Sequence, residues 1–279
     1  MDDLGIALRA TCYAGNPADA DGKRLSHLHS LTHSLTQWNL RCFMTDPRYN
    51  IYTLIHKGLR ASLCQQLVEL GRLDDTDTEA VTQQLEACNH LLRFCISHLQ
   101  HENHFIHTLL DEKRRVPAQL DISPLQTALD HQQHEQEIKK LQAEIALIKQ
   151  LPALRRRHVL LDFYSEFSLF VAENFTHMQV EETYNAELLW EFCSDAEIRN
   201  IQQRLIASLS PEENLQSLLM MLPNITYTER LEVLQPMAQV VPAETLSMLL
   251  SMLKPLLSNR EWHKLEQEVE LPALVANEV

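Results

Sequence analysis

The chain is poor in glycine and in strand-like sequence. Its 279 residues contain 5 glycines, and alternating runs of valine, isoleucine and threonine are absent. Apolar residues make up 45% of the chain, which is typical of neither a disordered nor a membrane protein. Leucine, glutamine, glutamate and alanine, which favour helices, are abundant. These features predict an all-α fold with a sizeable core.

The sequence also lacks the paired cysteines of a disulfide framework or a zinc site. Six cysteines are scattered along it, with no CxxC pair among them. They are Cys12, Cys42, Cys64, Cys88, Cys95 and Cys193. This pattern predicts reduced, mostly buried thiols and a cytoplasmic protein.

Positive charge is scarce. Lys and Arg number 24 against 38 Asp and Glu, which gives a net charge of −14 and argues against a nucleic-acid partner. The basic run Arg155-Arg156-Arg157 is expected to be a solvated helix face. The first residues do not contain a positively charged stretch followed by an apolar stretch, so we expect no signal peptide. No apolar stretch reaches membrane-spanning length, so no membrane partner is expected.

Helix start and stop signals divide the chain. Long helices are expected over about 49–70, 78–114, 123–150 and 153–192. Gly71, Pro117 and Pro152 end three of them, and Ser123-Pro124 begins one. Four long helices with short connections predict an antiparallel four-helix bundle over 49–193. Residues 1–48 are expected to form a partly helical N-terminal segment.

The remainder, 194–279, has a different pattern. Ser194 with Glu197, Ser210 with Glu213, and Thr226 with Glu229 each resemble a capping box. Together with further starts near 242 and 259, they predict five short helices. Because no glycine- or serine-rich linker intervenes, these helices are expected to dock on the bundle. They are also a candidate surface for a protein partner or for self-association.

Two histidine–carboxylate pairs share one spacing. His98 with Glu102, and His177 with Glu181, stand four residues apart, so each pair lies on one face of a helix. Apolar side chains flank both pairs at helical spacing. A buried carboxylate beside a buried imidazole is costly unless something compensates for it, and metal cations do so well.

The other two long helices also carry histidines on apolar stripes. His56 shares a stripe with Tyr52 and Leu59, and His134 shares one with Ile138, while His131 fits nearly the same stripe. Each carboxylate can bridge two cations about 3.5–4 Å apart. Mixed nitrogen and oxygen ligands suit iron, with zinc and manganese as competitors. Six such ligands leave positions open for a small diatomic molecule.

The order His, HxxxE, His, HxxxE over four helices resembles the hemerythrin (HHE) family. The blocks that carry the resemblance are 55–60 (IHKGLR), 98–103 (HLQHEN), 130–135 (DHQQHE) and 177–182 (HMQVEE). The resemblance implies a hemerythrin-like antiparallel four-helix bundle that holds two iron ions joined by an oxo or hydroxo bridge. It implies dioxygen or a related small molecule as ligand. The ligands carried over are His56, His98, Glu102, His134, His177 and Glu181, with His131 as a further candidate.

The sequence departs from the oxygen-carrying members of the family in two ways. Their fourth helix has Asp five residues after the histidine, whereas Glu181 stands four residues after His177. Their third metal-binding helix has histidines four apart, whereas His131 and His134 are three apart, so either or both could be ligands. These departures resemble the sensor-type hemerythrin domains more closely than the carriers.

Other polar residues near the ligands have secondary roles. Tyr52 and Tyr184 are candidate core aromatics or hydrogen-bond donors to a bound ligand. Glu173 is expected to face inward by its spacing, where it could either orient a ligand imidazole or extend toward the end of the bundle. The three histidines that follow His98 on the same predicted helix, His101, His104 and His107, are expected to be exposed or to lie behind the ligands.

Three functional hypotheses follow. In the favoured one, a non-haem diiron protein binds dioxygen or a related molecule in sensing, storage, or an iron or redox response. In the second, a diiron enzyme handles peroxide or nitric oxide, or oxidises a substrate. In the third, the chain is an interaction module without metal. The sequence leaves open whether the protein is an enzyme, with the balance against it.

Overall fold

A computed structural model describes residues 48–113 and 124–268. The chain divides into two units, Met1–Arg48 and Tyr49–Val279, and the described structure belongs almost wholly to the second. The partly helical segment predicted over 1–48 therefore lies outside the described residues. Within the described ranges the chain forms helices and turns but no strand, which confirms the predicted all-α class. None of the helices in these ranges has the length and apolarity needed to cross a membrane.

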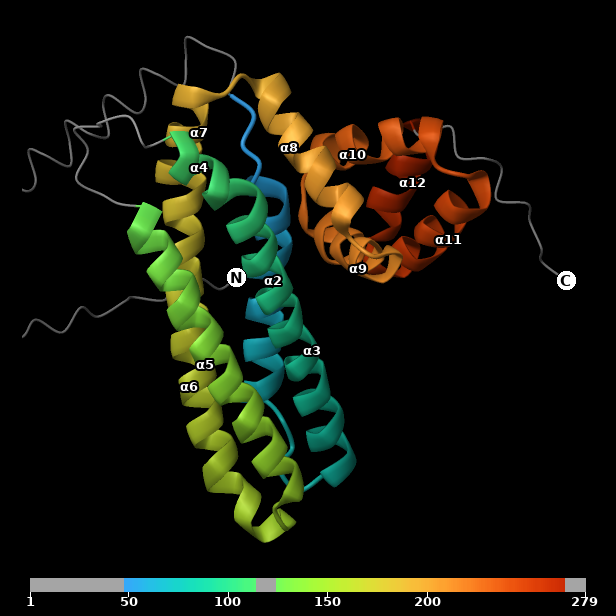
Figure 1. Ribbon diagram of the computed structural model, residues 1–279. Helices are drawn as coiled ribbons and strands as arrows, with labels where there is room; N and C mark the ends of the chain where they lie inside the picture. The colour runs from blue at the N-terminus through green and yellow to red at the C-terminus, as the bar shows by residue number, and fades with distance from the viewer. Residues whose placement is uncertain (1–47, 114–123, 269–279) are drawn as a thin grey trace, which may run out of the picture. The chain divides into compact units, whose positions relative to one another are not determined.

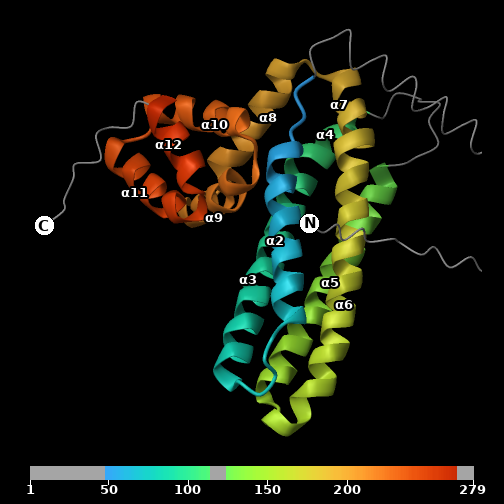
Figure 2. The ribbon, with the colours of Figure 1, turned by 180° about the vertical axis from the view of Figure 1, so that it is seen from behind.

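Four long helices pack side by side (Figure 1). They are α2 (Thr53–Gly71), α3 (Thr78–Glu102), α5 (Pro124–Gln150) and α6 (Ala153–Val180). Helix α2 packs against α3 and α6, and α5 packs against the same two helices, so the four enclose a common core. Figure 2 shows this packing from behind, with consecutive helices running in opposite directions. Phe163, Phe167, Leu85 and Ile148 lie at the centre of that core and are almost fully buried.

Polar groups fix the starts of these helices. The side chain of Asp77 accepts hydrogen bonds from the backbone N–H groups of Glu79 and Ala80 and so caps α3. Near the start of α6, Arg156 is buried and donates to the Leu151 carbonyl at 2.9 Å and to Thr78 Oγ1 at 3.0 Å. The expectation of a solvated basic face is therefore wrong for Arg156. Its guanidinium instead ties the starts of α3 and α6 together.

Two of the long helices change type near one end. A π-helix, η1 (Asn103–His107), follows α3 directly, and another, η2 (Glu181–Asn185), follows α6. Short α-helices continue each of them as α4 (Thr108–Lys113) and α7 (Ala186–Phe192). The sequence predicted uninterrupted α-helices here, and that prediction is wrong at these two points. Isolated π-turns inside α-helices are rare and concentrate at functional sites.

Short helices form the rest of the described chain. They are α8 (Asp195–Ser208), α9 (Pro211–Met221), η3 (Leu222–Asn224), α10 (Tyr227–Val240), α11 (Ala243–Leu253), η4 (Lys254–Leu256) and α12 (Asn259–Glu268). The capping boxes predicted at Ser194, Ser210 and Thr226 are confirmed. These helices bury a core of their own that includes Leu234, Leu253 and Leu265.

Helix α9 packs directly on α2. Gly58 makes this possible, because a Cβ atom placed there would lie 2.9 Å from the Met220 carbonyl oxygen and 3.0 Å from Met221 Cα. Both neighbours are backbone atoms, so they cannot move aside cheaply. An ion pair between Lys57 and Glu229 adds a polar contact beside this crossing.

Candidate metal centre

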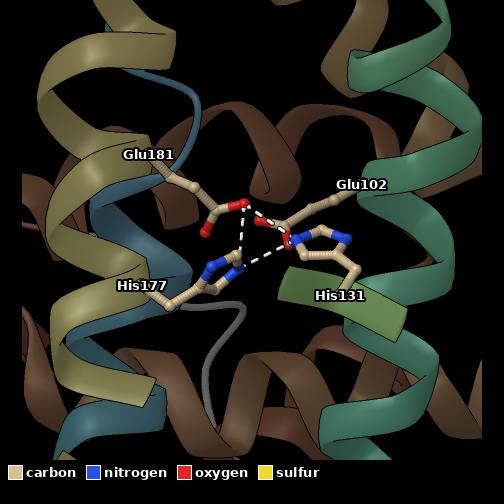
Figure 3. Close-up of side chains that lie close together, drawn as sticks. All are labelled: Glu102, His131, His177 and Glu181. Carbon is tan, nitrogen blue, oxygen red and sulfur yellow. Dashed lines mark hydrogen bonds and ion pairs between the residues drawn. The ribbon is translucent and has the colours of Figure 1, made fainter. Parts of the chain in front are cut away.

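Histidine and glutamate side chains from separate helices converge inside the four long helices. Glu102, His131, His177 and Glu181 form one group, drawn in Figure 3, in which all four are buried. A second group, made of His56, His98 and Glu102, adjoins it and shares Glu102. Of the seven candidate ligands, the structure brings together all except His134. Each group has the composition and spacing to hold a metal ion.

The distances within these groups match the edges of a coordination shell. Two atoms that each lie about 2.1 Å from one ion are about 3.0 Å apart at a right angle and about 3.4 Å apart at a tetrahedral angle. The Nε2 atoms of His131 and His177 are 2.8 Å apart. The Nε2 atom of His98 lies 3.1 Å from Glu102 Oε1, and the Nε2 atom of His56 lies 3.4 Å from the same oxygen. The side chains therefore fit cations placed between them.

The two oxygens of each carboxylate face different histidines. Glu102 turns Oε1 toward His56 and His98 and Oε2 toward His131, whose Nε2 atom is 3.9 Å away. Glu181 turns Oε2 toward His56 at 3.6 Å. Its Oε1 faces His131 at 3.2 Å and His177 at 3.4 Å. This division is the one required of carboxylates that bridge two cations.

Several buried polar atoms at the centre have no hydrogen-bond partner among the described residues. They are Oε2 of Glu102, Oε2 of Glu181, Nε2 of His98, and both ring nitrogens of His107. Buried polar atoms are almost always satisfied, and each exception calls for an explanation such as an ion. All these atoms are good ligand atoms, and cations at the centre would satisfy all of them except Nδ1 of His107, because only Nε2 of that ring faces Glu181.

His107 belongs to this centre, although the sequence gave it no ligand role. It is 4% exposed, and its Nε2 atom lies 3.6 Å from Glu181 Oε1. Its position five residues after Glu102 does not repeat the α-helical spacing, so a helical wheel places it at the edge of the stripe. The π-turn η1 corrects that angle and brings the ring inward. Its apolar neighbour Ile106, also buried, is the one sequence signal that this turn faces the core.

Outer residues orient two of the imidazoles. Glu182 Oε1 lies 3.0 Å from Nδ1 of His56 and also accepts from Arg60. Asn103 Oδ1 lies 2.8 Å from Nδ1 of His131. In both rings an N–H at Nδ1 would donate to these oxygens, which leaves Nε2 free to act as a ligand. Such partners fix ring orientation and tautomer in metal sites. Neither Glu182 nor Asn103 has a role that was predicted from the sequence.

The charges at the centre depend strongly on one another. Burial acts to lower the pKa of His56, but its hydrogen bonds to Glu102 and Glu182 outweigh that effect and raise the pKa to about 9. Burial and the mutual repulsion of the two carboxylates oppose ionisation of Glu102. The neighbouring His98 and His56 nevertheless hold the pKa of Glu102 below its usual range. For His131, burial dominates and lowers the pKa, which favours the neutral form of the ring that a cation requires.

The other predicted site residues lie around the two groups and do not belong to them. His134 is buried beside the His177 ring, but its Nδ1 atom pairs with Glu137 Oε2 at 3.3 Å, away from the two groups described above. Glu173 is exposed and joins that pair, so the prediction that it faces inward is wrong. The side chain of Tyr52 is buried against the His56 ring, whereas Tyr184 is half-buried.

No protein-family model, curated protein or solved structure matches this chain. The resemblance to hemerythrins therefore stays a prediction. What the geometry offers by itself is a buried histidine–carboxylate centre able to hold cations.

Proposed function

We propose that this chain is a non-haem diiron protein of the hemerythrin-like kind, which binds dioxygen or a related diatomic molecule. In this proposal α2, α3, α5 and α6 are the four-helix bundle that encloses the two iron ions. The observation that carries it is the division of the Glu102 and Glu181 oxygens between two sets of histidines. One cation alone would not account for that division.

The two sets of histidines are unequal. His56 and His98 would bind the first ion, and His107, His131 and His177 would bind the second. Both carboxylates would serve both ions. The first ion would then have one protein ligand fewer than the second, so a small molecule would bind there. Iron in such a site supplies binding and redox chemistry that no protein side chain provides.

The donor set is compatible with iron. Five imidazole nitrogens with carboxylate oxygens suit iron, zinc or manganese, and the absence of thiolate from the two described groups argues against an iron–sulfur or a thiolate-bound copper site. The polar groups near the centre favour a protein that binds a small molecule over an enzyme that converts a substrate. Glu182 is engaged by His56 and Arg60, and Asn103 by His131, so neither is free to move a proton to or from a substrate.

Metal analysis and an optical spectrum test the proposal. Protein purified from iron-replete cells should contain about two irons per chain. After reduction and exposure to air it should gain a charge-transfer band in the near-ultraviolet or visible range. Protein that takes up no iron, or that binds a single ion with no such band, would overturn the proposal. Sustained consumption of peroxide or nitric oxide with a reductant would instead support the enzyme hypothesis.

A further inference from the structure

A large cavity lies between the bundle and the C-terminal short helices. Its volume is about 680 Å³, and its walls come from α2 and α3 on one side and from α8, α9 and α10 on the other. Most of the lining is apolar, with Ile55, Phe94, Leu218, Val233 and Met237 among the contributors. Protein interiors contain few voids larger than a water molecule, and cavities of this size usually bind small organic molecules.

The cavity reaches the candidate metal centre from one side. His98 and Glu102 are part of its lining, whereas His107, His131 and His177 are not among the described residues that line it. Glu102 is 2% exposed, and its Oε2 atom has no hydrogen-bond partner among the described residues. The cavity therefore approaches the centre at the two-histidine half, where the proposed function leaves a position open.

The lining also contains a cation without a close ion pair. Arg93 is exposed, and no carboxylate of the described residues lies within 4.0 Å of its guanidinium. The charge of Arg93 reaches Glu86 at longer range, but Glu86 is already paired with Lys149. His90 lies one helical turn before it and also lines the cavity. Glu213, an acid of the lining, is already engaged by Ser210 and Ser97. Arg93 and His90 thus form a basic stretch on the α3 wall, whereas Arg199 and Glu232 line the facing helices α8 and α10.

We propose that this cavity binds an amphipathic organic anion, such as a medium-chain carboxylic acid. The apolar body lies against the walls of α2, α9 and α10, and the anionic head pairs with Arg93. Burial of the body supplies most of the binding free energy, and the head-group pairing supplies selectivity for anions. That the bound molecule also neighbours an iron ion rests on the proposed function.

Competition binding tests the chemical class. The full chain, metal-free and metal-loaded, is titrated with an anionic naphthalene sulfonate dye whose fluorescence rises in apolar sites. Dodecanoate should displace the dye at about tenfold lower concentration than dodecyltrimethylammonium, which has the same tail and the opposite charge. Arg93→Gln should remove most of that difference. Equal competition by acid and cation, or an unchanged preference in Arg93→Gln, would overturn the proposal.

Variants that fill the cavity test the location. Ile206 and Val240 line the cavity yet are 44% and 81% exposed, so Ile206→Trp and Val240→Trp should fold normally. Each should weaken dye and dodecanoate binding by at least about threefold. Leu169→Trp, on the exposed face of α6, is the matched control and should bind as the parent does. Unchanged binding in both cavity variants would place the dye elsewhere and defeat the proposal.

A spectroscopic arm separates this inference from the proposed function. Cobalt(II) is loaded in place of iron, and dodecanoate should shift its visible absorption bands, with a half-maximal concentration at least about threefold lower in the parent than in Ile206→Trp. If the absorption spectrum of the cobalt-loaded protein did not change with dodecanoate, the claim that the bound molecule lies next to the metal centre would be refuted. A protein that binds no cobalt or iron would refute the proposed function, while the dye measurements would still decide whether the cavity binds an amphipathic anion.

Discussion

The imidazole rings of His107 and His131 stack with their centroids 4.5 Å apart, and both direct Nε2 toward Oε1 of Glu181. One ring comes from the π-turn η1 and the other from α5, so the contact joins two separate helices. Together with His177, these rings surround the half of the centre opposite His56 and His98. This arrangement gives His107 a specific role that can be tested by substitution.

We expect His107→Ala to release the second ion selectively. Because the first ion keeps His56 and His98, the variant should retain about one metal ion per chain, while its affinity for the second ion falls by at least about tenfold. Metal content after dialysis against a weak chelator measures this. His104→Ala is the matched control, because His104 belongs to the same π-turn but is exposed. Full metal content in His107→Ala would remove this residue from the ligand set.

Replacing either carboxylate should have a larger effect. Glu102→Gln and Glu181→Gln keep the side-chain shape but remove the negative charge and one ligand oxygen. Since each carboxylate faces both sets of histidines, either change should release both ions, with affinity falling by more than about 100-fold. The melting temperature should then no longer respond to added metal, because metal binding stabilises only a protein that binds it. Glu135→Gln on α5 serves as the control, since Glu135 pairs with Lys139 away from the centre.

Much of this architecture is predictable from the sequence. The capping residues Ser194, Ser210 and Thr226 are local signals, and the structure uses all three as the sequence predicts. The HxxxE pairs are local as well, since four residues of α-helix fix the relation of His98 to Glu102. Such features depend on neighbours in the chain and not on tertiary packing.

The missed features depend on long-range contacts or on irregular backbone. No residue pattern near His107 predicts a π-turn. A prediction from regular α-helical spacing therefore puts the His107 ring at the edge of the inward-facing stripe and not at the centre. Arg156 finds its partners at Thr78 and at the Leu151 carbonyl, and the first of these is 78 residues away. His134 shares an apolar stripe with Ile138, but three residues separate it from His131, and that offset turns it toward Glu137. Sequence periodicity cannot resolve an angular difference of this size.

The outer partner of His56 should tune the centre without being essential. Glu182→Gln keeps an oxygen near Nδ1 of His56 but removes the negative charge. Metal affinity should fall by about 10–100-fold while two ions still bind at saturation. A competitive chelator titration distinguishes reduced affinity from reduced capacity. An unchanged affinity would show that Arg60 and Glu182 form only a structural ion pair.

Metal binding should release protons. Hydrogen bonds to Glu102 and Glu182 outweigh burial and raise the pKa of His56 to about 9, so the metal-free protein holds an extra proton there at pH 7. An ion bound at Nε2 displaces that proton. Calorimetry in buffers with different ionisation enthalpies should show release near pH 7 that disappears as the pH rises through about 9. In the metal-free protein, the stabilisation from charged His56 is fully present below pH 6.5 and is lost as the pH rises through about 9.

Gly58→Ala should disturb the contact between α2 and α9. Alanine improves helix propensity by about 1 kcal/mol relative to glycine, but overpacking against backbone costs about 1–3 kcal/mol. Because the added Cβ would meet backbone atoms of Met220 and Met221, we expect net destabilisation in urea unfolding. Ser62→Ala on the same helix controls for propensity alone. A Gly58→Ala protein more stable than the parent would show that α9 can shift without loss.

The two π-turns make the exact length of the chain at the centre matter as much as its composition. Each turn closes its hydrogen bonds over one more residue than an α-helix does, and η1 directly follows Glu102 while η2 begins at Glu181. Removing one residue from 103–107 would restore ordinary α-helical winding and leave the downstream residues on nearly the same faces. Inserting one more residue before His107, under ordinary helical winding, would instead rotate His107 and everything downstream by about 100°. The His107 ring would then leave the interior, and Leu110 of α4, which is buried, would turn toward water. A one-residue insertion in this segment is therefore expected to be more damaging than most substitutions.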